Sequence, residues 1–252
     1  MASPACCQRP PVTVEYKTQG RWDEFAGLKT YIVGPENATK AVIDIYDVFG
    51  MWPQTLQGAD LISALTGALV IVPDFFEGSA AGIDWIPADT PEKQKLVGEF
   101  IQTKASFDKN VPALMRVRKA LSGRYPAVDD HIGVFGLCWG GKVGVLASGA
   151  DNEGPGRRFN VCGTAHPGRL DIKDGESLTA PYILLASKDE PAEVVEEYRT
   201  LLSQPGKIGE VETYPDMHHG WMGARADLAN ASNVKEYTRG YEQIAAFFKK
   251  HL

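Results

Sequence analysis

The sequence lacks the features that mark disulfide-stabilised or membrane-spanning proteins. It has only four cysteines in 252 residues, and the one close pair, Cys6 and Cys7 near the amino terminus, is no disulfide framework. No run of about 18 apolar residues is present to span a bilayer. The opening MASPACCQRPP also has neither the basic nor the apolar region of a signal peptide. These absences predict a cytoplasmic protein that does not bind membranes.

The chain also lacks an excess of positive charge. Its 26 Lys and Arg residues are outnumbered by 32 Asp and Glu, which gives a formal net charge of -6. A nucleic-acid partner would require a basic face to neutralise phosphates, so we expect none. No repeat, low-complexity stretch or linker divides the sequence. We therefore expect one domain over residues 1–252, in which residues 1–11 form a flexible tail.

What the sequence does contain is an alternation of two kinds of apolar segment. Short segments rich in β-branched and aromatic residues, bounded by turn formers, predict strands. Longer segments with helical periodicity predict helices. The predicted strands are residues 30–33, 41–46, 68–72, 131–135, 160–163, 182–186 and 210–214. The predicted helices are about residues 53–65, 91–106, 108–122, 141–148, 193–202 and 234–250. This alternation predicts a single-domain α/β fold with a mostly parallel central sheet, helices on both faces, and a ligand site at the carboxyl ends of the strands.

One of these strand ends carries a cysteine between glycines. The segment GLCWGG, residues 136–141, directly follows the strand HIGVF and precedes a predicted helix. A nucleophile at such a turn needs Gly136 and Gly140 beside it, because side chains there would clash with the neighbouring chain. The helix N-terminus favours a thiolate at Cys138, and the Trp139 N–H would face a developing oxyanion. Alternatively, Cys138 is a small buried residue and the glycines only pack helix against strand. No G-x-S-x-G offers a competing serine, so Cys138 is the predicted nucleophile.

Two later strand ends supply an acid and a base in the chain order of α/β hydrolases. Asp189 follows the strand PYILLAS, and two adjacent histidines follow the strand EVETY. Taken alone, Asp189 could be a helix cap, and a loop histidine often has no role. Together, Asp189 would hold the imidazole that accepts the thiol proton. We assign the base to His219 because Gly220 lets the loop turn that imidazole inward. His218 would face solvent or support the loop.

With these residues identified, the chain resembles the dienelactone hydrolase family over nearly its whole length, in the branch common among fungal proteins. The resemblance rests on the motifs GLCWGGK, IYDVFGM, VPDFFEG, SKDEP and HHGWMGAR. It implies a single-domain α/β-hydrolase fold, no metal, no organic cofactor, and a triad of Cys138, Asp189 and His219. It also implies small lactones or esters as substrates, often carrying a carboxylate. A homodimer is compatible with the sequence, which does not fix the oligomeric state.

The resemblance assigns roles to three more residues. Residues 47–50 match the family's oxyanion loop, so Val48 would contribute an N–H beside that of Trp139. Asp47 stands where bacterial members carry a glutamate that holds the resting thiol. It either gates the thiol or hydrogen-bonds to backbone N–H groups of its loop. Arg225 matches one of two arginines that bind the substrate carboxylate in bacterial relatives.

The leading hypothesis is hydrolysis of a small ester or lactone through an acyl-thioester on Cys138, followed by attack of a water activated by His219. One alternative is a lyase, isomerase or thioesterase step in a biosynthetic pathway on the same triad, because a fold does not fix a function. A second alternative is a non-catalytic protein that binds a small molecule. His166, in the motif AHPG after a predicted strand, either lines the pocket or packs the loop.

Overall fold

The central feature of the computed structural model, which describes residues 8–149 and 156–252, is one eight-stranded sheet. The strands are β1 (Arg21–Phe25), β2 (Leu28–Val33), β3 (Ala41–Ile45), β4 (Leu69–Pro73), β5 (Ile132–Leu137), β6 (Val161–Ala165), β7 (Tyr182–Ser187) and β8 (Gly209–Tyr214). Their order in the sheet is β1-β2-β4-β3-β5-β6-β7-β8. The strands from β4 to β8 in this order pair in parallel, whereas β1, β2 and β4 pair antiparallel. The predicted mostly parallel sheet is therefore confirmed.

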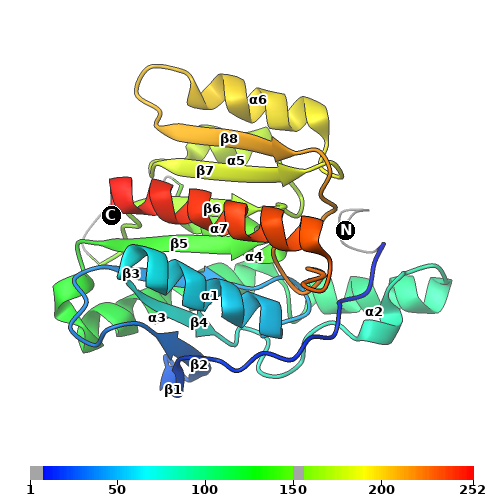
Figure 1. Cartoon of the computed structure of the whole chain (residues 1–252), viewed down its shortest axis with the longest axis horizontal. Helices are drawn as coiled ribbons and strands as arrows, with labels where there is room; N and C mark the ends of the chain where they lie inside the picture. The colour runs from blue at the N-terminus through cyan, green and yellow to red at the C-terminus, as the bar shows by residue number, and fades with distance from the viewer. Residues whose placement is uncertain (1–7, 150–155) are drawn as a thin grey trace.

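Helices cover both faces of this sheet. They are α1 (Pro53–Thr66), α2 (Pro91–Gln102), α3 (Phe107–Arg124), α4 (Trp139–Ala147), α5 (Ile172–Ser177), α6 (Ala192–Leu202) and α7 (Ala231–His251), with short 3₁₀ turns η2 (Ile83–Trp85) and η3 (Pro126–Val128). Helices α1 and α7 pack against each other on the front face in Figure 1, and α3 and α4 lie behind the sheet. Because β3 to β7 are covered on both sides, every residue of these five strands is buried.

The edges of the sheet explain what the sequence pattern missed. Strand β1 was not predicted, because its sequence RWDEF is rich in charge and only Phe25 is fully buried. It pairs with β2 through a hairpin whose turn residues Ala26 and Gly27 both have positive φ, 52° and 81°. Such a turn matches the twist of the two strands.

The short helix α5 was also missed. Helix α4 begins at Trp139, two residues earlier than predicted.

The described part of the predicted amino-terminal tail lies along the body of the protein. The Val12 N–H donates to the Ala224 carbonyl at 2.8 Å, and the Arg9 carbonyl accepts a hydrogen bond from Arg225 Nε at 2.5 Å. Figure 1 shows this end of the chain on the side where the carboxyl ends of the parallel strands lie. Cys6 and Cys7 lie outside the described residues.

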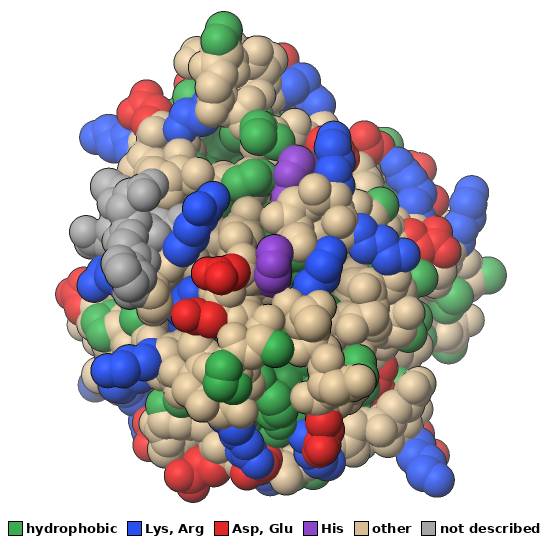
Figure 2. Space-filling view, turned by 90° about the vertical axis from the view of Figure 1, so that its left-hand side faces the viewer, with side chains coloured by type: hydrophobic (Ala, Val, Ile, Leu, Met, Phe, Trp, Pro, Cys, Tyr) green, Lys and Arg blue, Asp and Glu red, His purple; other side chains and the backbone are tan. Residues whose placement is uncertain are grey.

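The opposite end of the sheet has a mixed surface. Figure 2 shows the face at the left of Figure 1, and the described Lys and Arg side chains there are interspersed with Asp and Glu. The absence of a nucleic-acid partner stays a prediction. Within residues 8–149 and 156–252, none of the helices combines the length and apolar character needed to cross a bilayer.

Candidate active site

Cys138 occupies a strained turn between β5 and α4. Its φ of 51° and ψ of −111° lie in a region that residues with a side chain rarely adopt, at a cost of about 1–3 kcal/mol. The loop after β6 holds this turn from both sides. The Cys138 N–H donates to the Ala165 carbonyl at 3.1 Å, and its carbonyl accepts from the Gly168 N–H at 3.0 Å. The predicted order of strand, tight turn and helix is present.

The two glycines flanking Cys138 are required by close backbone contacts. A Cβ at Gly136 would collide with the backbone of Gly140, and a Cβ at Gly140 would collide with the Ile45 carbonyl in the neighbouring strand β3. Any side chain at either position would push α4 away from the sheet. This is the physical reason for the G-x-C-x-G spacing in this chain.

The histidine loop after β8 brings His219 to the thiol. His219 Nε2 lies 3.1 Å from Cys138 Sγ, and both residues are buried. Gly220 has a φ of 94°, as expected for the residue that turns this loop. His218 points elsewhere: its Nε2 lies 3.2 Å from the Arg225 carbonyl, so it supports the loop. The structure thus places His219, and not His218, beside the predicted nucleophile.

The carboxylate that contacts the His219 imidazole belongs to Glu190, one residue after the predicted Asp189. Glu190 Oε1 lies 2.7 Å from His219 Nδ1, and the two side chains are only 2% and 1% exposed. Asp189 instead accepts the backbone N–H of His219 at 2.8 Å. The second Glu190 oxygen accepts the Ser187 N–H, which folds this longer side chain back toward the strand end. The motif SKDEP contains both carboxylates, and the sequence does not reveal which of two adjacent side chains turns inward.

Asp47 holds two loops together through its carboxylate. Oδ1 accepts the Phe49 N–H at 2.9 Å and Oδ2 accepts the Ala224 N–H at 3.0 Å. These are the contacts of the backbone-binding alternative, and thiol gating stays a prediction. Burial raises the pKa of Asp47, and the nearby Arg225 guanidinium and the two N–H groups act in the opposite direction. Asp47 therefore links the predicted oxyanion loop to the loop that carries His219.

The two predicted oxyanion donors come from neighbouring strand ends. Val48 follows β3 and Trp139 follows β5, and these strands are paired, with Ile45 opposite Gly136. Trp139 is the first residue of α4, where backbone N–H groups have no partner within the helix. Its indole packs on Phe76 with ring centroids 4.5 Å apart, so the side chain belongs to the core. The oxyanion role of the two N–H groups stays a prediction.

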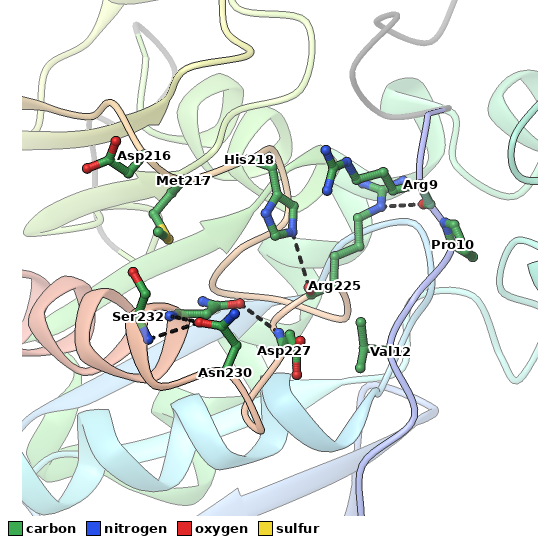
Figure 3. A pocket seen from close by; sticks show the side chains of 11 residues that line it. Arg9, Pro10, Val12, Asp216, Met217, His218, Arg225, Asp227, Asn230 and Ser232 are labelled. Carbon is green, nitrogen blue, oxygen red and sulfur yellow. Dashed lines mark hydrogen bonds between the residues drawn. The ribbon is translucent and has the colours of Figure 1, made fainter.

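Arg225 is a buried cation that packs against Gly220 in the loop that carries His219. It is 2% exposed, and its guanidinium lies 4.9 Å from the centre of the Phe49 ring. Figure 3 shows its side chain reaching toward Arg9, with His218 hydrogen-bonded to its carbonyl. These residues border a cavity of about 570 Å³ that extends to the start of α7. Binding of a substrate carboxylate by Arg225 stays a prediction.

His166, for which the sequence left pocket lining and loop packing open, lies beside His219. It follows β6, is fully buried, and its ring centroid is 5.1 Å from that of His219 in an edge-to-face arrangement. Burial, and after it the nearby charge of His219, lowers the pKa of His166 well below its usual value. His166 is therefore a neutral imidazole. In the described part of the chain, His, Cys, Asp and Glu side chains form no cluster of three that could bind a metal ion.

Comparison with known proteins relates this chain to one family. A family model described as "Dienelactone hydrolase family" matches residues 28–252. An AIM2 family protein of Schizosaccharomyces pombe is 35% identical over 229 residues, which cover 90% of this chain and 89% of that protein. A carboxymethylenebutenolidase homolog of Xenopus tropicalis is 27% identical over 256 residues, covering 95% and 94% of the two chains.

Solved structures extend the similarity to the fold. A dienelactone hydrolase from Anabaena variabilis superposes with a TM-score of 0.65 at 14% identity, covering 94% of this chain and 98% of that one. A putative dienelactone hydrolase from Klebsiella pneumoniae gives 0.64 at 20% identity, covering 92% and 94%. At these identities the likeness concerns the fold alone, and it confirms the predicted α/β-hydrolase fold.

Proposed function

Because this chain belongs to the dienelactone hydrolase family and is a carboxylic ester hydrolase-like enzyme, we propose that it cleaves a small ester or lactone with Cys138 as the nucleophile. The observation that supports this proposal is the continuous set of buried contacts from the thiol through His219 to Glu190, at 3.1 Å and 2.7 Å. This arrangement has the three roles of a nucleophile, a base and an orienting acid.

In the first half-reaction, His219 Nε2 takes the proton of the Cys138 thiol. The thiolate attacks the carbonyl carbon, and the N–H groups of Val48 and Trp139 hydrogen-bond to the oxyanion. When this intermediate collapses, the bond between carbon and the ester oxygen breaks, and the leaving oxygen takes the proton from His219. The product is an acyl-thioester, and for a lactone the released hydroxyl stays attached to the acyl chain.

In the second half-reaction, a water gives a proton to His219 Nε2 and attacks the thioester carbonyl. The carbon–sulfur bond then breaks, the carboxylic acid leaves, and the proton returns to Cys138. In both halves His219 becomes positively charged for a moment, and the Glu190 carboxylate stabilises that charge in a buried setting. Asp189 holds the backbone of His219, so that the imidazole keeps its orientation toward the thiol.

The substrate is a small molecule, and we propose that Arg225 favours one that carries a carboxylate. Its guanidinium is a buried positive charge close to Asp47. The substrate's identity, the homodimer and the cytoplasmic location are hypotheses from the sequence. A lyase, isomerase or thioesterase reaction on the same residues, or simple binding, remain the alternatives to be tested against hydrolysis.

The test is the fate of the thiol during turnover of a chromogenic ester such as p-nitrophenyl acetate. Acid-quenched enzyme should carry an acetyl group on Cys138, and Cys138→Ala should lose both this adduct and turnover. Cys162→Ala is the matched control and should keep both, because burial raises the pKa of the Cys162 thiol to about 12 and holds it as a thiol. Turnover by Cys138→Ala would contradict the proposal, and substrate binding without any adduct or product would favour a binding protein.

A further inference from the structure

His166 lies beside the proposed base, and its imidazole has no role in the two half-reactions described above. It is 0% exposed, and neither of its ring nitrogens has a hydrogen-bond partner on another of the described residues. A buried polar group without a partner destabilises the folded protein, because it has lost its hydrogen bonds to water. His166 has two such atoms at the edge of the reaction centre. This indicates that its ring forms hydrogen bonds with a molecule that enters the site.

The backbone around His166 fixes its position against the nucleophile. Its φ is 39°, in the left-handed region, and its N–H donates to the Leu185 carbonyl at 2.7 Å. The residues on either side bind Cys138 directly: the Ala165 carbonyl accepts its N–H, and the Gly168 N–H donates to its carbonyl. A Cβ placed on Gly168 would lie 3.2 Å from Cys138 Sγ, so this loop forms the wall beside the thiol.

The protonation state of His166 determines what it can do there. Burial, and with a smaller effect the permanent positive charge of Arg225, lower the pKa of His166 and keep the ring neutral. A neutral imidazole has one N–H donor and one nitrogen acceptor. His166 therefore does not compete with His219 for the proton of the thiol. It can, however, donate one hydrogen bond and accept another without changing its charge.

We propose that His166 holds the water that hydrolyses the acyl-thioester. This inference rests on the proposed function, because it assigns a residue to the second half-reaction. Water is both a donor and an acceptor, and thus matches a neutral imidazole. The two rings pack edge to face with their centroids 5.1 Å apart, so a water bound to His166 would lie next to the base that must deprotonate it. His219 takes one proton of this water, its oxygen attacks the thioester, and His166 keeps the hydrogen bond that orients it.

Removing the two ring nitrogens of His166 should slow the second half-reaction more than the first. In His166→Phe the ring that packs on His219 remains and both nitrogens are lost. With p-nitrophenyl acetate in rapid-mixing experiments, formation of the acyl-enzyme should stay within about threefold of the wild type. Its breakdown should slow about tenfold, the value of one hydrogen bond to the reacting water. Acid-quenched samples should then contain more acetylated Cys138 during steady turnover than the wild type.

Two controls keep this test decisive. His166→Asn retains a donor and an acceptor and suits a left-handed backbone, so its acyl-enzyme should break down faster than that of His166→Phe. The rate constants of acylation and deacylation are both measured on the active molecules of one sample. Partial unfolding therefore lowers the burst amplitude and leaves the ratio of these two rate constants unchanged. The inference is overturned if acylation and deacylation fall together, if neither falls, or if Asn slows breakdown as much as Phe. Failure of the thioester pathway itself would appear separately, as turnover by Cys138→Ala.

Discussion

Replacing Glu190 with glutamine tests which carboxylate serves the base. The change keeps the size of the side chain and removes its charge, while Asp189→Asn makes the same change one residue earlier. Glu190 Oε1 lies 2.7 Å from His219 Nδ1 with both side chains almost fully buried. Water therefore screens the pair poorly, and the carboxylate is the group that stabilises an imidazolium formed during the reaction. Losing the acid of such a triad costs on the order of 10⁴ in rate.

The matched variant should behave differently, because Asp189 accepts a backbone N–H. An asparagine amide oxygen can accept the same hydrogen bond, so Asp189→Asn should lose no more than about tenfold. The assay is kcat/KM on p-nitrophenyl acetate for both variants and the wild type, together with thermal unfolding to verify that each is folded. The reasoning is refuted if Asp189→Asn is the inactive variant and Glu190→Gln stays within tenfold of the wild type.

Two further predictions concern the base and a buried carboxyl. His219→Ala should lower kcat/KM by about 10² to 10⁴ whereas His218→Ala should fall well short of that, and the opposite order on the same chromogenic ester would reject His219 as the base. Asp44 in β3 is fully buried, and burial raises its pKa well above the ordinary 3.8 against a smaller opposing effect of the Ile45 backbone N–H. The contribution of Asp44 to the free energy of unfolding is thus complete below pH 3.8 and is lost as the pH rises toward the folded-state pKa. Urea unfolding from pH 4 to 8 should therefore show Asp44→Asn gaining stability relative to the wild type. Parallel curves for the two proteins would contradict this.

The part of the site that lies within one continuous segment could be predicted from the sequence. The turn that holds Cys138 needs glycines at two fixed positions, and steric contact makes that need visible in the residues themselves. The order of acid and histidine likewise follows from the succession of strands. These relations are local, or depend only on which element comes next.

The choice between Asp189 and Glu190 could not be predicted in the same way. It depends on how the turn after β7 directs two successive side chains, and on the Ser187 N–H that binds Glu190. For the same reason, the proximity of His166 to His219 depends on the pairing of β6 between β5 and β7, which the sequence pattern does not specify. Strand β1 was missed because an edge strand is half exposed and has no continuous apolar run.

Hydrogen bonds between the amino-terminal segment and the histidine loop limit which truncations and fusions would leave the site intact. The Val12 carbonyl accepts hydrogen bonds from both Trp52 Nε1 and Gln54 Nε2, and its N–H holds Ala224. Gln54 in turn donates to the Ala226 carbonyl at 3.0 Å. A truncation or fusion that displaces Val12 would thus remove a support of the loop that carries His219. For engineering, the segment around Val12 should therefore be kept intact, because its hydrogen bonds support the loop that carries His219.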